Sequence, residues 1–133
     1  MATDDQHGVV TLSGDADIDK LLRRAVARIE VLGLEVFAVI DHSGDAADVG
    51  LTMPEAKLVL FGSSKRGAEL MLAHPSLALD LPLKLLIHED DDGRVFVSYN
   101  APSYLAHRYD LTDDEADALQ IVETIARTTS SRS

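Results

Sequence analysis

The strongest constraint on the fold is a continuous apolar stripe at helical spacing between residues 18 and 32. Apolar side chains recur there every three or four positions, at Ile18, Leu21, Leu22, Ala25, Val26, Ile29 and Leu32. Gly33 follows, at a place where a left-handed residue commonly ends a helix. Residues 34–40 are rich in β-branched and aromatic side chains, which predicts a strand directly after the helix. A helix with one apolar face must bury it against another element, so a layered domain is expected.

The remaining elements complete an α+β pattern. Further strands are predicted at residues 9–12, 57–61, 83–89 and 94–99. The last two are joined around Asp92-Gly93, a pair typical of a tight hairpin, and the apolar run at 57–61 predicts a strand buried on both faces. Helices are expected at 65–73, near Tyr104, and after the capping-box pattern of Thr112 to Glu115. The order predicts a mixed β-sheet of about five strands packed by helices in a single domain.

Composition sets the class of protein. The chain has 133 residues, of which 46% are hydrophobic and 26% charged, and this suits one globular domain at residues 9–127 with disordered tails at 1–8 and 128–133. No apolar run approaches the roughly 20 residues that cross a bilayer. The chain has no cysteine, which excludes thiol catalysis, iron–sulfur clusters and cysteine–zinc sites. A cytoplasmic location is predicted, since such a sequence fits a reducing compartment.

The charge is strongly acidic. There are 23 Asp and Glu residues against 12 Lys and Arg, which gives a net charge of −11. Nucleic acid and anionic membranes are therefore not expected as partners, because binding either requires a cationic surface. The spacing of Asp15, Asp17 and Asp19 resembles the start of a calcium loop, but Lys20 stands where the loop needs glycine. No metal and no cofactor are predicted.

Several segments resemble a known family. They are residues 58–62, residues 78–84, Ser98-Tyr99-Asn100 and Asp41-His42. Together they resemble the bacterial and archaeal family called domain of unknown function 302, over nearly the whole of residues 9–127. The resemblance implies a small α+β domain, a homodimer, and no assigned reaction. The family usually carries a proline near the position of Ser64, which this sequence lacks.

The junction after residues 57–61 is the first candidate site. Gly62, Ser63, Ser64 and Lys65 form a glycine-containing turn that enters a helix, where free backbone N–H groups and nearby positive charge suit an anion. The turn matches neither a Walker loop nor a dinucleotide fingerprint. The alternative is that one serine simply caps the helix. Lys65→Ala is expected to weaken the binding of an anionic ligand.

The second candidate set consists of polar residues at predicted strand ends. His42 and His88 each stand beside a carboxylate, that of Asp41 and Glu89 respectively, and imidazole with carboxylate suits acid–base chemistry. Tyr99, Asn100 and Asp80 are expected near one end of the hairpin, where side chains often line pockets. Each of these residues also has an ordinary structural explanation as a cap, a turn anchor or a surface group.

Two functions follow from these candidates. The first is a non-enzymatic, homodimeric domain that binds a small ligand, such as an anion, or a protein. The second is a small enzyme that uses Asp41, His42, His88 or Tyr99 as acid–base groups in a pocket. Convergence of His42, His88 and Tyr99 within hydrogen-bond reach would favour the enzyme.

Overall fold

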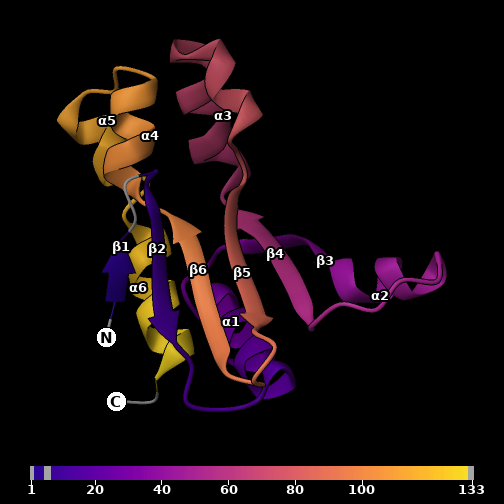
Figure 1. Cartoon of the computed structure of the whole chain (residues 1–133). Helices are drawn as coiled ribbons and strands as arrows, with labels where there is room; N and C mark the ends of the chain where they lie inside the picture. Colours follow the sequence, from indigo (N-terminus) through magenta and orange to yellow (C-terminus); the bar gives the residue numbers. More distant parts are fainter. Residues whose placement is uncertain (1, 5–6, 132–133) are drawn as a thin grey trace.

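The structure, a computed structural model, describes residues 2–4 and 7–131 (Figure 1). In chain order, the elements are β1 (Ala2–Asp4), β2 (Val9–Ser13), α1 (Ile18–Val31), β3 (Glu35–Asp41), α2 (His42–Asp48), β4 (Ala56–Gly62), α3 (Ser64–Ala73), the 3-10 helix η1 (Pro75–Leu79), β5 (Leu83–Glu89), β6 (Val95–Asn100), α4 (Pro102–Arg108), α5 (Asp113–Asp117) and α6 (Ile121–Ser130). The α+β class and the hairpin between β5 and β6 are confirmed.

The strands form one sheet in the order β1-β2-β6-β5-β4-β3. Every pairing among the described strands is antiparallel, so the prediction of a mixed sheet is wrong. The helix predicted at residues 65–73 forms as α3 but does not cross the sheet. Instead α3 and η1 extend beyond the sheet's end, and the chain returns as β5 directly beside β4 (Figure 1). A helix placed in a turn leaves its flanking strands antiparallel.

One face of the sheet is packed by α1 and α6. Leu21, Ala25 and Ile29 of α1 are fully buried there, in one cluster with strand residues such as Val59 and Ile87. The alternation along each strand puts every second side chain into this core. The Asp17 carboxylate accepts a hydrogen bond from the Lys20 N–H and caps α1, which is the ordinary role of aspartate at a helix start.

Parts of both predicted tails have regular secondary structure in the described residues. Residues 2–4 form β1, which pairs with β2 through the backbone. Thr128 to Ser130 belong to α6, where Thr129 is fully buried and the Ser130 carbonyl accepts a hydrogen bond from the Asp15 N–H. The C-terminal residues were predicted to be disordered because they are polar, and the sequence did not reveal that α6 packs along α1. Residues 1, 5, 6, 132 and 133 lie outside the described residues.

A second, smaller core lies beyond the end of the sheet. Leu70, Leu77, Leu105 and Leu119 bring α3, η1, α4 and the segment after α5 together. His74, after α3, places its Nε2 2.9 Å from both Glu115 carboxylate oxygens. Glu115 also completes the predicted capping box with Thr112. The hydrogen bond that the Thr112 N–H donates to Glu115, together with the contact to His74, holds the pKa of Glu115 below its usual range. The helices therefore form a fixed unit above the strands.

The other face of the sheet, hereafter the open face, carries no helix (Figure 1). On β2, β4, β5 and β6 it presents Val9, Thr11, Ser13, Ala56, Leu58, Leu60, Lys84, Leu86, His88, Phe96, Ser98 and Asn100. Leu58 and Leu60 are half-buried, while Val59 and Phe61 are fully buried. The expectation that residues 57–61 are buried on both faces is thus met on one face of this chain only.

None of the helices in the described part of the chain has the length and apolar character of a membrane-spanning segment.

Candidate functional site

A large cavity lies where the sheet meets the helical unit. Its volume is about 880 Å³, within the range of roughly 300–1,000 Å³ that is usual for small-molecule sites. Most of its lining is apolar and comes from Leu34, Phe37, Leu60, Phe61, Leu70, Met71, Leu81, Pro82, Leu83, Ala118, Leu119 and Ile121. Segments from β3 to α6 therefore contribute to one apolar space.

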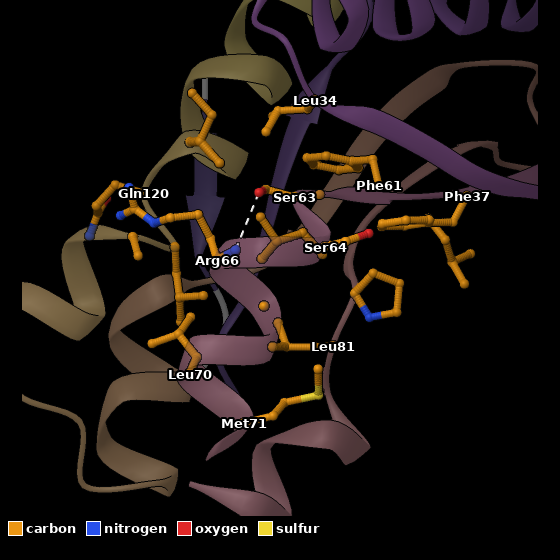
Figure 2. A pocket seen from close by; sticks show the side chains of 18 of the residues that line it. Leu34, Phe37, Phe61, Ser63, Ser64, Arg66, Leu70, Met71, Leu81 and Gln120 are labelled. Carbon is orange, nitrogen blue, oxygen red and sulfur yellow. Dashed lines mark hydrogen bonds between the residues drawn. The ribbon is translucent and has the colours of Figure 1, made fainter. Parts of the chain in front are cut away.

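Polar groups occupy part of the same lining. They are Ser63, Ser64, Arg66, Asp117, Gln120 and Thr124. Ser63 stands at the start of α3, with Leu34 and Phe61 on one side and Leu70 and Met71 on the other (Figure 2). The lining is therefore mostly apolar, and its polar groups come from two places, the start of α3 and the stretch from Asp117 to Thr124.

The start of α3 has an ordinary serine cap, which is the alternative interpretation of the turn at residues 62–65. The Ser63 hydroxyl accepts a hydrogen bond from the Arg66 N–H at 3.3 Å, so Ser63 is the helix cap (Figure 2). The cap satisfies one of the first N–H groups of the helix, and those of Ser64 and Lys65 precede it. No described residue forms an ion pair with the Arg66 guanidinium, which belongs to the lining. Lys65 is exposed and lies outside the lining.

Asp41 and His42 lie away from this cavity. Asp41 ends β3 and caps α2, where its carboxylate accepts hydrogen bonds from the Gly44 N–H at 3.0 Å and the Ser43 hydroxyl at 2.8 Å. These bonds hold the pKa of Asp41 below its usual range. His42 is the first residue of α2 and is exposed. The start of α2 therefore explains why Asp41 and His42 stand next to each other.

Asp80 is an anchor of the helical unit. Its carboxylate accepts a hydrogen bond from the Tyr109 hydroxyl and lies 3.3 Å from the Arg108 guanidinium. The hydrogen bond to Asp80 raises the pKa of Tyr109. The Lys84 ammonium donates to the carbonyls of Asp80 and Pro82, and burial lowers the pKa of Lys84. Asp80 therefore joins α4 to the chain before β5 and does not line the cavity.

His88 and Tyr99 lie on opposite faces of the sheet. His88 is half-buried on the open face, and its Nε2 lies 2.9 Å from the Ser98 hydroxyl. Ser98 in turn is 2.8 Å from the Thr11 hydroxyl. Tyr99 is buried against the helices, while His42 stands beyond the far edge of the sheet. The convergence that would favour an enzyme is absent from these three positions.

Asn100 ends β6 in register with Val9 and is exposed. It lies at the same end of the sheet as Asp80, as expected, but outside the cavity lining. Among the described residues there is no group of three or more His, Asp or Glu side chains placed to hold a metal ion. Of the ten predicted site residues, the structure brings Gly62, Ser63 and Ser64 to the cavity.

Sequence reasoning missed most of the lining. Phe37 and Met71 have no signal that separates them from core residues, because an apolar side chain looks the same in a sequence whether it faces a core or a cavity. Gln120 and Thr124 belong to a predicted terminal helix. In that helix the sequence indicated burial for the apolar residues only, so these two polar residues were not predicted to line a site. Arg66 carried a usable signal, since it is the second cation after the Ser63-Ser64 turn.

Comparisons with known proteins identify the family. Residues 9–130 match the family described as "Domain of unknown function DUF302". The chain belongs to the DUF302 family. An uncharacterized conserved DUF302 protein from Bacillus stearothermophilus has the same fold, with a TM-score of 0.77 over 92% of this chain and 95% of that chain, at 12% identity. At this identity the likeness supports the fold of the DUF302 domain alone.

Longer proteins contain a segment similar to this DUF302 domain. The proteins named "Fluoride-specific ion channel FluC 1" from Brucella suis biovar 1 and Brucella abortus biovar 1 are each 33% identical to it over 111 residues. The match covers 84% of this chain but only 44% and 41% of those proteins. The DUF302 domain thus spans less than half the length of these relatives.

Proposed function

We propose that this DUF302 domain is a non-enzymatic binding module whose cavity takes a small ligand with an apolar body and an anionic or polar end. The cavity of about 880 Å³ carries the proposal. Ligand sites combine a mainly apolar lining with a few placed polar groups, and this lining has that composition. The turn at Ser63 and Ser64, with the Arg66 guanidinium, supplies the polar end.

The test uses three probes that share one alkyl chain: octanoate, octanol and octylammonium. Titration calorimetry is expected to show saturable binding, tightest for octanoate. Ala118→Phe, which fills the lining, should abolish binding, whereas Ala27→Phe on the exposed side of α1 should not. Thermal melts of both variants check that they fold. Failure of all three probes to bind, or unchanged binding by Ala118→Phe, would contradict the proposal.

Arg66 and Lys65 form a matched pair for the anionic end. Arg66→Gln is expected to weaken octanoate binding by about three- to tenfold, with octanol unaffected, because an exposed charge contributes up to about 1 kcal/mol. Lys65→Gln removes the same charge one residue away, outside the lining. An equal loss in both variants would indicate general attraction of an anion to positive charge and no specific role for Arg66.

Fluoride is the second candidate ligand, favoured by the names of the Brucella relatives. A small anion suits the N–H groups of Ser64 and Lys65 at the start of α3. Amide NMR spectra recorded with sodium fluoride and with sodium chloride are expected to show a saturable shift of these two amides in fluoride only. Equal shifts in both salts would reject fluoride.

We also propose that the domain acts in the cytoplasm as a homodimer joined through the open face. On β2, β4, β5 and β6 this face carries no carboxylate, and its Lys84 ammonium is already bonded to two carbonyls. In a chain of net charge −11, these four strands without carboxylates are where two copies approach with least repulsion. Depletion of charge is also typical of interface cores.

Light scattering after gel filtration tests the dimer. The wild type is expected at twice the chain mass of 14.4 kDa. Leu86→Lys, on the open face, should give a single chain mass, whereas Leu72→Lys, at an 85% exposed position on α3, should stay dimeric. A wild type of single chain mass at every concentration would overturn the proposal.

A further inference from the structure

The β3 edge of the sheet leaves backbone groups without a neighbouring strand. β3 is the last strand in the sheet order and pairs with β4 alone. Within the described part of the chain, residues 35–40 form no backbone hydrogen bond other than those to β4. Their outer N–H and C=O groups therefore face away from the sheet, as a template for one more strand.

This edge is also unusually apolar. Among the residues whose side chains the structure describes, half of the ten exposed large hydrophobic ones belong to the short stretch from β3 to the segment after α2: Phe37, Val39, Val49, Leu51 and Met53. None of the α2 residues is buried, and α2 stands out from the side of the sheet (Figure 1). Proteins usually protect an edge strand with charge, proline or a cover. The centre of β3 has a bulge at Phe37 but no charged residue.

Carboxylates surround the apolar stretch. Residues 35–55 contain Glu35, Asp41, Asp45, Asp48 and Glu55 and no Lys or Arg. All five are exposed. The edge thus presents a backbone template and apolar side chains inside an acidic frame.

We infer that the β3 edge binds an extended segment of another protein, in which apolar residues alternate with Lys or Arg, as an added strand. Main-chain hydrogen bonds to β3 supply affinity in this mode, and alternate side chains supply specificity. The apolar side chains of the segment would contact Phe37 and Val39, and its cations the surrounding carboxylates. A second copy fits poorly, because antiparallel self-pairing centred on Ala38 sets Glu35 of each copy against Asp41 of the other.

The test uses fluorescence anisotropy with two labelled peptides of about eight residues, the length of a strand. One alternates valine with lysine and the other alternates valine with glutamate. The lysine peptide is expected to bind the full chain and to weaken with added salt, and the glutamate peptide not to bind. Hydrogen exchange should slow for the amides of residues 36–40 in the presence of the lysine peptide.

A matched pair of double variants separates the edge from the overall charge. Asp45→Lys with Asp48→Lys is expected to lower affinity about tenfold, since two attractive exposed charges become repulsive. Glu69→Lys with Asp91→Lys makes the same change of net charge at exposed positions outside the edge, and should have less than about a third of that effect.

Three results would overturn the inference. They are failure of the lysine peptide to bind or to protect the β3 amides, an equal loss of affinity in the two double variants, and loss of self-association of the chain in Val39→Ser. The last result would assign the edge to a second copy.

Discussion

The two faces of the sheet differ in what covers them. On one face, Val59, Leu85, Ile87 and Val97 are fully buried beneath α1 and α6. On the open face, their neighbours in sequence, such as Leu58 and Leu86, are half-buried and no helix lies over them. A strand that is apolar at every position is typical of sheets covered on both sides. The sequence of β4 therefore suits two covered faces, while the fold of one chain covers one.

This difference teaches how to interpret a continuous apolar run. A continuous apolar run predicts that both faces of a strand are buried, but it does not say whether one chain covers both of them. The open face also contains a hydrogen-bonded series of Thr11, Ser98 and His88, with Ser98 only 6% exposed. Satisfied polar groups, and the absence of carboxylates on β2, β4, β5 and β6, lower the desolvation cost of a contact on this face.

The largest expected effect compares two adjacent residues of β5. Leu85 is fully buried on the helix-covered face and Leu86 is half-buried on the open face. Leu85→Ala is expected to lower the free energy of unfolding by about 2–5 kcal/mol, because it leaves a cavity in the core. Leu86→Ala should cost roughly 1 kcal/mol at low protein concentration, since less apolar area is lost.

Urea denaturation of both variants provides the measurement. Equal costs at low concentration would show that the two faces are covered alike within one chain. A cost for Leu86→Ala that grows with protein concentration would instead measure burial of the open face by a second copy.

Local sequence signals predicted the individual elements of the fold well. The apolar stripe and Gly33 gave the extent of α1, and Gly33 does adopt a positive φ of 77°. Asp92-Gly93 gave the hairpin, with β5 at residues 83–89 as predicted. These features depend on neighbours in sequence, so one segment is enough to reveal them.

Features that depend on distant segments could not be predicted. Strand direction was misjudged because the 3.6-residue pattern of α3 does not reveal whether the helix crosses the sheet or extends past its end. The cavity could not be predicted for a similar reason. Its lining residues are spread from Leu34 to Thr124 and come together only in the folded chain. Of the site, the glycine-serine turn alone had a local signature.

The smallest expected effect concerns pH and the open face. Burial lowers the pKa of His88 from its ordinary value of 6.5, so the folded chain favours the neutral imidazole. The unfolded chain then binds more protons below pH 6.5, and the stability contributed by neutral His88 is lost as the pH falls below that value.

His88→Gln keeps a polar partner for Ser98 but does not titrate. Urea denaturation between pH 7 and about pH 5 is therefore expected to show a steeper loss of stability in the wild type than in the variant. Carboxylates whose pKa is lowered, such as that of Glu115, change the stability at more acidic pH. They are the same in both proteins, so they do not affect this comparison. Identical pH profiles would mean that His88 on the open face is as well solvated as it is in the unfolded chain. The open face would then behave like an ordinary exposed surface and not like a half-buried one.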